Sequence, residues 1–505
     1  MIGLRILMAS PEAVPFVKTG GLADVVGALP HSLAKMGHIV KVVMPLYSAI
    51  DQSKYKLHPV KFPDGEHYIN LADTDHRLEA LTTTDQESGV QFIFIRNDYY
   101  FDRDGIYLDK STGEDFPDND ERYAFFARAV LELTEAIGFQ PDILHLHDWQ
   151  SAMIGGYLRT LYADEQFFEN TRTIFTIHNI GYQGHFPKDT FLKLGLDKSY
   201  YTPGSPFEYW GHINYLKVGI TTSDIITTVS ETYAQEIQSS NEMGFGMEGI
   251  LFYLRDSLFG VLNGVDYDIW SPEKDSLIPF NFSINNVSNK QKNKQALLKM
   301  AGLDSGSLDK PLIGVISRLA DQKGFDLIEQ IADDLFALDI QMVLLGTGDS
   351  KYHALFEALE QMHHQKLKAF LAFDNKLAHL IEAGANMFLM PSLYEPCGLN
   401  QMYSLKYGTV PIVRKTGGLA DTVIDFNENP DQGNGFVFEE YQPEKLMTAI
   451  QRALIAYNDQ KIWQNIVLRG MRADHSWDAS ANKYEYIYKH ALSQPKSDKL
   501  HFHTV

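Results

Sequence analysis

Short apolar runs alternate with amphipathic stretches through the first half of the chain. Runs typical of buried strands cover residues 4–9, 38–44, 142–146, 172–177 and 225–229. Apolar residues at helical spacing follow Gly21 and recur over residues 123–137, which end at Gly138. This alternation of strands and helices predicts a doubly wound parallel sheet, whose ligands bind beyond the carboxyl ends of the strands.

The same alternation returns in the second half of the chain. Apolar runs cover residues 312–317, 341–345, 369–373, 387–390 and 410–413. We place a boundary between Phe259 and Trp270, which predicts one Rossmann-like α/β domain over residues 1–262 and a second over residues 263–476. Residues 50–120 mix strand-like pieces with charged turns and are expected to form an irregular insertion.

Composition narrows the class of protein. A chain of 505 residues is too long for one hydrophobic core, which agrees with two domains. The net charge of -21 disfavours nucleic acid and anionic membranes as partners. The single cysteine excludes an intrachain disulfide, the N-terminus lacks a signal-peptide pattern, and no apolar run reaches membrane-spanning length. These features predict a cytoplasmic protein, and they leave the oligomeric state open.

One segment occurs twice in the sequence. KTGGLAD begins at Lys18 and again at Lys415, each time between a predicted strand and a predicted helix. The N-terminus of a helix leaves backbone N–H groups unpaired, and such groups bind anions. One glycine pair alone is weak evidence, because glycines are common where a helix starts close to a strand. Two copies at equivalent junctions predict two anion-binding edges, one in each half.

Charged residues also follow two strands of the second half. Arg318 and Lys323 come just after residues 312–317, where a guanidinium and an ammonium can neutralise a diphosphate. Most such pairs are solvated surface groups, but a place at a strand end favours the functional interpretation. Glu395 follows residues 387–390 beside a predicted helix start, where it can accept sugar hydroxyls or only oppose the helix dipole.

Some histidine, aspartate and cysteine residues are candidates for metal binding or nucleophilic chemistry. His147, Asp148 and His178 follow predicted strands, but no HExxH or CxxC spacing accompanies them. Hydrogen bonding to a polyol is therefore the preferred interpretation. Cys397 lies at a helix start without a local base signature, so we expect it to pack or to line a substrate site.

Over nearly its whole length the chain resembles bacterial glycogen synthases and plant starch synthases. The segments that carry the resemblance are KTGGLADVVGALP, HDWQ, TIHNIGYQGHFP, NGVDYDIWSP, SRLADQKGFDL, LGTGD and EPCGLNQMYSLKYGTVPIVRKTGGLADTV. The resemblance implies a family 5 glycosyltransferase of GT-B fold. Two Rossmann-like domains then face each other across a cleft, and a last helix over about residues 477–490 packs back on the first domain.

The implied reaction is the transfer of glucose from ADP-glucose to the non-reducing 4-OH of an α-1,4-glucan such as glycogen or a maltooligosaccharide. It proceeds with retention of configuration and without a metal or another cofactor. The implied catalytic residues are Glu395 on the glucose hydroxyls, His178 near the anomeric carbon, and Arg318 and Lys323 on the departing diphosphate.

The implied substrate-binding residues come from both halves. In the first half they are Lys18, Gly20, Gly21 and Asp24 around the nucleotide sugar, and Asp148 on glucose or acceptor hydroxyls. In the second half they are Asn263 at the domain junction, Phe373 on the adenine, Cys397, the amides of Gly398 and Leu399, and the helix start Thr416, Gly417 and Gly418 for the distal phosphate.

The chain departs from the family pattern at three positions: Asn400 replaces a usual Thr, and Glu382 and Phe373 each replace a frequent Tyr. Other functions stay open at this point. A silent nucleotide-sugar or glucan-binding protein would tolerate the loss of Lys18, Arg318, Lys323 or Glu395, and all four are present. A glucan phosphorylase would show pyridoxal phosphate absorbance. A NAD-dependent oxidoreductase is disfavoured, because the G-x-G-x-x-G pattern with a downstream acid is missing.

Overall fold

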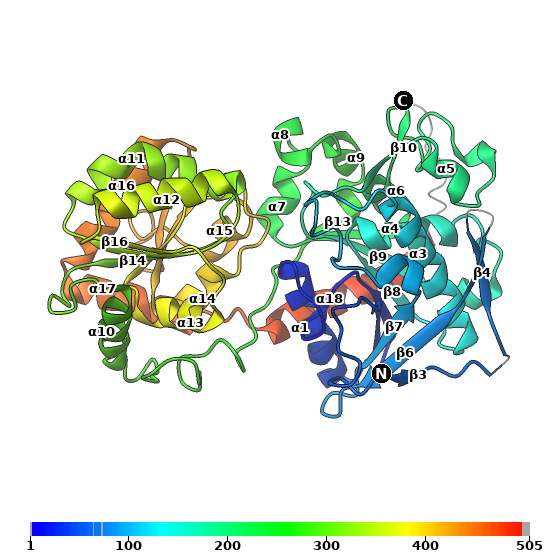
Figure 1. Cartoon of the computed structure of the whole chain (residues 1–505), viewed down its shortest axis with the longest axis horizontal. Coiled ribbons are helices and arrows are strands. Elements are labelled where there is room, and N and C mark those ends of the chain that lie inside the picture. The colour runs from blue at the N-terminus through cyan, green and yellow to red at the C-terminus, as the bar shows by residue number, and fades with distance from the viewer. Residues whose placement is uncertain (1–2, 64, 72–73, 497–505) are drawn as a thin grey trace. The chain divides into compact units, whose positions relative to one another are not determined.

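The computed structural model describes residues 3–63, 65–71 and 74–496, and these form two compact units. The first unit runs to Val229, continues over Ala234–Val261 and resumes at Trp477. The second unit comprises Ser230–Tyr233 and Leu262–Ser476. Each unit contains its own largely parallel sheet with helices, which confirms the predicted fold class (Figure 1).

One short segment departs from the expected division at residues 262 and 263. Ser230–Tyr233 belong to the second unit, although they precede the predicted boundary. Here the Thr232 N–H donates to the Asp421 carboxylate at 3.1 Å, and the Thr232 hydroxyl donates to the same carboxylate. The chain therefore contributes four residues to the second unit before it returns to the first.

The first unit is built on a sheet of nine strands within the described residues. Its order from edge to edge is β13 (Leu258–Gly260), β12 (Ile225–Thr228), β9 (Arg172–Ile177), β8 (Ile143–His147), β1 (Arg5–Ala9), β2 (Ile39–Pro45), β7 (Gln91–Arg96), β6 (Glu79–Thr84) and β3 (His58–Pro59). Strands from β13 to β7 pair in parallel, whereas β6 and β3 pair antiparallel. The predicted strands of this half are all present, because their apolar residues are buried in the sheet.

The prediction of an irregular insertion over residues 50–120 is wrong in part. β7 extends the main sheet beside β2, because its Phe92, Ile93, Phe94 and Ile95 are all buried. β6 and β3 then continue the sheet. The rest of this region includes the hairpin β4 (Tyr68–Leu71) and β5 (Thr74–Arg77) and the short helix α2 (Asp98–Phe101).

Helices accompany the sheet of the first unit. They are α1 (Gly21–Lys35), α3 (Asn119–Ala136), α4 (Trp149–Leu158), α5 (Thr190–Lys193), α6 (Tyr215–Thr222), α8 (Asn241–Gly244), α9 (Glu248–Tyr253) and α18 (Trp477–Ser493), and α7 (Glu231–Glu236) begins in the second unit. α1 buries Leu22, Val25, Val26, Leu29 and Leu33, which recur every three or four residues. A small antiparallel pair, β10 (His185–Pro187) and β11 (His212–Asn214), lies outside the main sheet.

The last helix, α18, packs in the first unit beside α1, although the two are far apart in the sequence (Figure 1). The Ser32 hydroxyl of α1 donates to Asp478 of α18 at 3.2 Å. Tyr484 and Tyr488 of α18 are fully buried. The chain thus enters the second unit and comes back to finish the core of the first.

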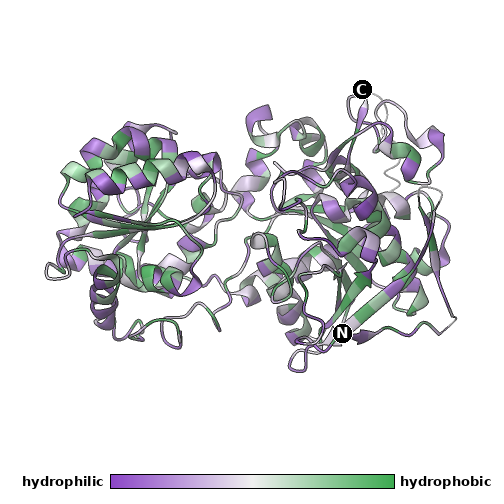
Figure 2. Ribbon diagram, in the orientation of Figure 1, coloured by the Kyte–Doolittle hydropathy of each residue, from purple (hydrophilic) through white to green (hydrophobic). Residues whose placement is uncertain are grey.

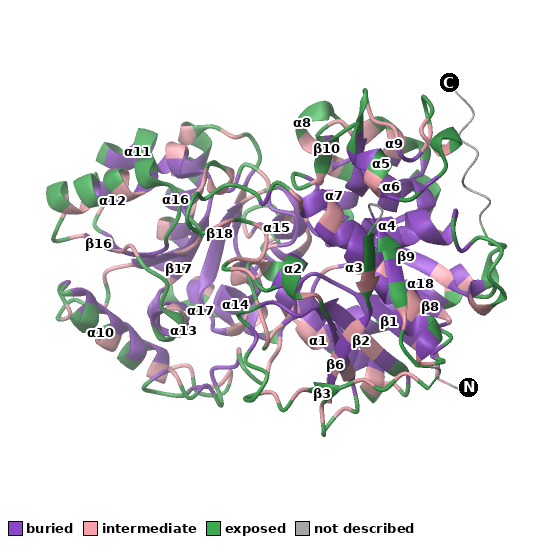
Figure 3. Cartoon of the chain, turned by 45° about the vertical axis from the view of Figure 1, so that its right-hand side comes forward, coloured by how far each residue is buried: buried purple, intermediate pink, exposed green. Residues whose placement is uncertain are grey.

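The second unit contains a sheet of six strands, again counted over the described chain. Its order is β16 (Leu367–Phe370), β15 (Gln341–Leu345), β14 (Leu312–Ile316), β17 (Met387–Met390), β18 (Val410–Arg414) and β19 (Phe436–Phe438), and all neighbours pair in parallel. The strands are predominantly hydrophobic and buried (Figures 2 and 3). The strand predicted over residues 369–373 lies earlier, at Leu367–Phe370, because Ala369 pairs with Leu344 of β15 and the chain then turns toward the next helix.

Helices also accompany the second sheet. They are α10 (Asn289–Ala301), α11 (Phe325–Ala337), α12 (Ser350–Met362), α13 (Asn375–Gly384), α14 (Asn400–Lys406), α15 (Gly417–Thr422), α16 (Pro443–Tyr457) and α17 (Gln460–Arg472). None of the helices in the described ranges combines the length and apolar character that a bilayer crossing requires.

Each sheet has a point where its strand order reverses. In the first unit this point lies between β1 and β8, and in the second unit between β14 and β17. Loops that leave neighbouring strands in opposite directions bind the ligands of doubly wound folds. The fold therefore predicts that ligands bind at the loops after β1 and β8 in the first unit and after β14 and β17 in the second.

Candidate active site

The loop between β1 and α1 carries the first KTGG segment, and a buried glutamate binds its backbone. The Glu12 carboxylate accepts the Thr19 N–H and, at 3.0 Å, the Thr19 hydroxyl. It also accepts the Gly20 N–H. The Gly20 amide therefore faces the Glu12 carboxylate in this structure, and its role toward a substrate anion stays a prediction.

Lys18 is held by the helix that follows it. Its Nζ lies 2.7 Å from the Asp24 carboxylate in the first turn of α1, and half of the Lys18 side chain is exposed. Burial raises the pKa of Asp24, whereas the charge and hydrogen bond of Lys18 lower it. An ammonium has three N–H donors, so Lys18 can keep Asp24 and still bind a ligand.

Asp148 and His178 meet at the ends of β8 and β9. The Asp148 Oδ1 accepts the His178 N–H at 2.7 Å, and Asp148 has φ 56° and ψ 179°, a strained backbone conformation that residues other than glycine rarely adopt. Burial raises the pKa of Asp148 to about 8; the N–H of His178 lowers it and the charge of Glu12 raises it. Asp148 thus titrates near neutral pH, as the acids and bases of many active sites do.

A chain of buried imidazoles extends behind His178. Its Nε2 lies 3.0 Å from Nδ1 of His147, whose ring contacts that of His145 at a tilt of 34° with centroids 4.1 Å apart. Nδ1 of His145 lies 2.8 Å from the Tyr488 hydroxyl on α18. Burial lowers the pKa of His145 and of His178 to about 3. His178 is therefore a neutral group, and within the described chain its buried Nδ1 has no hydrogen-bond partner.

In the second unit an ion pair joins the two loops that flank the switch point. Lys323, which follows β14, places Nζ 2.6 Å from Oε2 of Glu395, which follows β17. The Ser392 hydroxyl donates to the same oxygen at 3.0 Å. The side chain of Glu395 is 8% exposed and that of Lys323 is 20% exposed. Partial burial strengthens such a pair, because solvent screens it less than a surface pair.

The second KTGG segment packs tightly against the loop that holds Glu395. Gly417 has a φ of 44°, and a Cβ added there would lie 2.0 Å from the Glu395 carbonyl oxygen. The Gly418 N–H donates to the carbonyls of Glu395 and Pro396, each at 3.2 Å. This amide is thus partnered inside the chain in this structure, and its role toward a phosphate stays a prediction. Thr416, the residue before α15, is fully buried.

The helix start after Glu395 is different. Leu399 is the N-cap residue of α14, and no side chain caps that helix. Over the described ranges, neither the Gly398 nor the Leu399 N–H donates to another group of the chain. These two amides therefore have no acceptor among the described residues, and their role beside Glu395 stays a prediction.

Cys397 and Asn263 lie together under this loop. The backbone N–H of Asn263 donates to the Cys397 sulfur, and burial raises the pKa of the thiol to about 12. The thiol thus stays protonated at neutral pH and is no nucleophile. The Asn263 Oδ1 is buried and has no hydrogen-bond partner among the described residues.

Two further predicted residues follow strands of the second sheet. Arg318 comes two residues after the end of β14, between that strand and Lys323. Phe373 lies between β16 and α13, and 87% of its surface is exposed. An exposed ring at a strand end can stack on a planar base. Phe373 follows β16 and Arg318 follows β14, and β15 lies between these two strands in the sheet.

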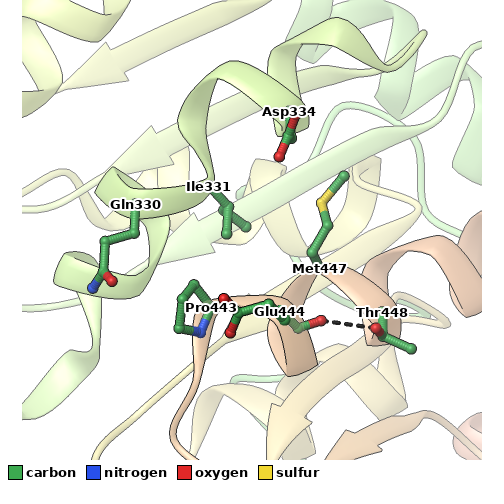
Figure 4. Close-up of a pocket in the computed structure, with 7 residues that line it drawn as sticks. All are labelled: Gln330, Ile331, Asp334, Pro443, Glu444, Met447 and Thr448. Carbon is green, nitrogen blue, oxygen red and sulfur yellow. Dashed lines mark hydrogen bonds between the residues drawn. The ribbon is translucent and has the colours of Figure 1, made fainter.

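A groove of about 460 Å³ lies elsewhere on the second unit, between α11 and α16 (Figure 4). It is lined by Gln330, Ile331, Asp334, Pro443, Glu444, Met447 and Thr448. It contains none of the predicted site residues, and its only charged side chains are anionic, which disfavours a diphosphate. Across the described residues no three His, Cys, Asp or Glu side chains are grouped so that they could hold a metal ion.

Three contacts of the site were not predicted from the sequence. Glu12 binds the first KTGG loop, Ser392 donates to Glu395, and His147 contacts His178. Each of these residues follows or ends a strand at the switch-point edge, so its position in the sequence indicated that it could lie near the site. Its partner was not predictable, because these contacts join residues that distant strands bring together.

The burial of Cys397 leads to a first prediction. In the native protein at pH 8 we expect iodoacetamide to label this thiol at least about tenfold more slowly than in guanidinium-unfolded protein, because alkylation needs an accessible thiolate. Intact mass spectrometry against time measures both rates on the single cysteine. Equal labelling rates in the two states would contradict a buried, protonated thiol.

Comparisons with known proteins agree with this geometry. Residues 5–252 match the model of the family described as starch synthase catalytic domain, and residues 304–466 match that of glycosyl transferases group 1. The glycogen synthase of Syntrophotalea carbinolica is 44% identical over 97% of this chain and 99% of its own length. The glycogen synthase of Koribacter versatilis is also 44% identical, over 97% of this chain and 98% of its own.

Solved structures show the same relationship. The catalytic domain of starch synthase IV from Arabidopsis thaliana, bound to ADP and acarbose, superposes with a TM-score of 0.88 at 34% identity, and the match covers 97% of this chain and 100% of that one. A sucrose-phosphate synthase from Thermosynechococcus elongatus shares the fold, with a TM-score of 0.57 at 17% identity. The chain therefore belongs to the glycogen synthase and starch synthase family of glycosyltransferases.

Proposed function

We propose that this protein is a retaining glucosyltransferase that elongates an α-1,4-glucan from ADP-glucose. The observation that carries the proposal is the Lys323–Glu395 pair, which combines a cation and a carboxylate across the switch point of the second sheet. A departing diphosphate needs the cation, and a sugar that gains positive charge needs the carboxylate. The relatives at 44% identity are glycogen synthases, which perform glucosyl transfer.

On this proposal the diphosphate binds between Arg318 and Lys323. The Lys323 ammonium has three N–H donors, so it can keep its bond to Glu395 and donate to phosphate oxygens as well. Arg318 adds a planar fork suited to two phosphate oxygens. Both residues lie in the loop after β14, which places their charges next to each other along the chain.

On the same proposal each unit supplies candidate groups for the glucose ring, Glu395 in the second and His178 in the first. The Glu395 carboxylate accepts sugar hydroxyls, and the Gly398 and Leu399 amides donate to the same ring. His178 is neutral, so its unpartnered Nδ1 forms a hydrogen bond to the sugar without repelling positive charge at the anomeric carbon. Asp148 fixes the backbone of His178 and accepts a hydroxyl of glucose or of the acceptor.

The proposed reaction is a displacement on one face of the sugar. The bond between C1 and the phosphate oxygen breaks, and the electron pair leaves with the diphosphate. The 4-OH oxygen of the glucan bonds to C1 from the same face, and its proton passes to the departing phosphate oxygen. Lys323 and Arg318 stabilise the charge that develops on the diphosphate, which is where preorganised donors contribute most to the rate.

The choice of ADP-glucose has two supports. Phe373 presents an exposed ring at the end of β16, where an adenine can stack. The starch synthase IV relative was solved with ADP bound, and it covers almost the same length of chain. We propose no resident cofactor, because each step above uses only side chains and amides of this chain.

The decisive experiment supplies ADP-glucose and UDP-glucose separately, each with glycogen as primer, and measures the release of nucleoside diphosphate. We expect ADP release that depends on glycogen and is at least about tenfold faster than UDP release, the size of one lost polar or stacking contact. Faster UDP release would overturn the donor assignment. No release from either donor would overturn the proposed activity.

The two KTGG segments provide a matched pair of variants. A Cβ added at Gly20 meets nothing within 4 Å, whereas at Gly417 it clashes with the Glu395 carbonyl. Gly20→Ala is therefore expected to keep its melting temperature and to raise the donor KM several-fold, because the methyl group fills space beside Lys18. Gly417→Ala is expected to lower the melting temperature by about 4 °C or more, through strain of at least about 1–3 kcal/mol. An unchanged donor KM in Gly20→Ala would remove the support for a ligand at this loop.

A further inference from the structure

Glu12 ties the first KTGG loop to the end of β1. Its own backbone is fixed first, because the Ser10 hydroxyl donates to the Glu12 carbonyl at 2.8 Å and accepts the Glu12 N–H at 3.3 Å. The Ser10 N–H in turn donates to Val43 of β2. From this anchored position the Glu12 carboxylate binds Thr19 through two donors and Gly20 through one.

The carboxylate is almost completely enclosed. Glu12 is 3% exposed, and no cation pairs with it within the described chain, since Lys18 is directed to Asp24. The ionisable groups whose charges act on it or respond to it are Asp24, Asp148 and the phenols of Tyr47, Tyr107 and Tyr123. An enclosed carboxylate among these groups keeps its charge only through the three N–H and O–H donors of the loop.

The second KTGG segment has different contacts. There the Gly418 N–H donates to backbone carbonyls of the Glu395 loop, and Lys415 pairs with Glu439. The first loop is shaped around the Glu12 carboxylate. Loss of that anion removes the acceptor that orients two successive peptide groups directly beside Lys18.

We propose that Glu12 is a positioning residue that holds the Lys18, Thr19 and Gly20 backbone in the shape that binds the nucleotide-sugar donor. The inference rests on the proposed function, because it takes Lys18, which the family resemblance assigns to the nucleotide sugar, as a group that binds the ADP-glucose donor. Thr19 and Gly20 do not contact the diphosphate through their amides, since Glu12 occupies them. The Lys18 ammonium is the group of this loop that binds the donor. Glu12 fixes the backbone that carries the Lys18 side chain and so determines the position of the ammonium.

The bonds of Glu12 to the loop depend on its ionisation. Burial raises the pKa of Glu12 to about 7, although the hydrogen bonds from Thr19 and Gly20 lower it. Above this pH the carboxylate accepts from all three donors. As the pH falls through about 7 the group takes up a proton, and one oxygen becomes a hydroxyl that no longer accepts in the same way. Donor binding should weaken on the acid side for that reason.

The test compares Glu12→Gln with the wild-type protein in donor KM and kcat from pH 6 to pH 8. A glutamine presents an NH₂ group to one of the three donors, so the loop loses at least one bond. We expect a donor KM raised about tenfold at pH 8 with kcat changed less than threefold. The ratio of the two KM values should fall toward one at pH 6, because protonated Glu12 is similar to glutamine. Glu12→Gln also removes the charge that raises the pKa of Asp148, so the KM ratio is read together with a hydrogen-exchange measurement, which does not depend on Asp148.

Glu382→Gln is the matched control, because Glu382 is also a buried carboxyl with a raised pKa, of about 8, but binds Ser404 in the second unit. Its donor KM should stay at the wild-type value at each pH. A Glu12→Gln ratio that equals one at pH 8, or that is constant with pH, would overturn the inference.

A second measurement does not depend on activity. Hydrogen exchange followed by mass spectrometry should show at least tenfold faster exchange at Thr19 and Gly20 in Glu12→Gln, with peptides from β8 unchanged. If Glu12→Gln does not fold, Thr19→Val removes only the hydroxyl donor and is expected to raise exchange at Gly20 about threefold. Exchange rates equal to those of the wild-type protein in both variants would overturn the positioning role of Glu12, whether or not the protein transfers glucose. An absence of glucosyl transfer in the wild-type protein would count only against the proposed function.

Discussion

Replacing Glu395 with glutamine is expected to lower kcat by about a thousandfold while the protein keeps its fold. The substitution preserves size and can preserve the bond from Ser392, but it removes the negative charge that faces Lys323 and the sugar. Preorganised charges that act on the transition state contribute about 2.7–4 kcal/mol each in mutational series. The measurement is kcat at saturating donor and glycogen, with circular dichroism as the test of folding.

Lys323→Ala provides the internal comparison for this prediction. If Glu395 and Lys323 act as one unit, the double variant Glu395→Gln and Lys323→Ala should have a kcat only slightly below that of the less active single variant. The reason is that the effects of residues that act together are not additive. Ser392→Ala, which removes one hydroxyl donor, should cost less than about tenfold. A Glu395→Gln enzyme within threefold of the wild-type kcat would show that this carboxylate has no part in the reaction.

Removal of the partly buried Trp270 side chain is expected to cause a large loss of stability in the second unit. The indole is stacked between His379, with centroids 3.8 Å apart, and Tyr403, at 3.9 Å. His379 in turn bonds to Asp275 at 2.7 Å, and the Tyr407 hydroxyl donates to the same carboxylate at 2.6 Å. Trp270→Ala is expected to lower the free energy of unfolding of the second unit by about 3–5 kcal/mol, because it leaves a cavity between two rings.

The control for this prediction is Trp210→Ala in the first unit, where 85% of the indole surface is exposed. That variant should change the free energy of unfolding by less than about 0.5 kcal/mol, as exposed substitutions usually do. Guanidinium unfolding followed by circular dichroism measures both, since it does not depend on tryptophan fluorescence. Equal stabilities of the two variants would mean that the stacked rings at Trp270 contribute nothing.

The positions of the site loops were predictable from the apolar runs. The runs predicted over residues 4–9, 142–146 and 387–390 correspond to the strands Arg5–Ala9, Ile143–His147 and Met387–Met390, and Lys18, Asp148 and Glu395 follow these strands. The reason is that a buried parallel strand must be apolar along its whole length, so its end is visible in the sequence. The strand near Phe373 was misplaced by a few residues, because that apolar run continues past the last ladder bond.

The repeated KTGGLAD segment shows where the sequence stops being informative. In the first copy the lysine pairs with the aspartate six residues on, and Glu12 binds the amides between them. In the second copy the lysine pairs with Glu439, the aspartate accepts from Thr232, and the glycines pack on the Glu395 loop. Identical residues thus have different partners, because those partners come from parts of the chain that only folding brings near.

By itself the sequence determined the fold class, the order of the strands along the chain, the loops that carry the site and, through resemblance, the family. The tertiary structure decided which of the candidate groups are already engaged: the Gly20 amide by Glu12, the Gly418 amide by Glu395 and Pro396, and the Lys323 ammonium by Glu395. Local patterns follow from the period of helices and strands, which neighbouring residues set. Hydrogen bonds and pKa values follow from burial and from contacts distant in sequence, which only the packed chain defines.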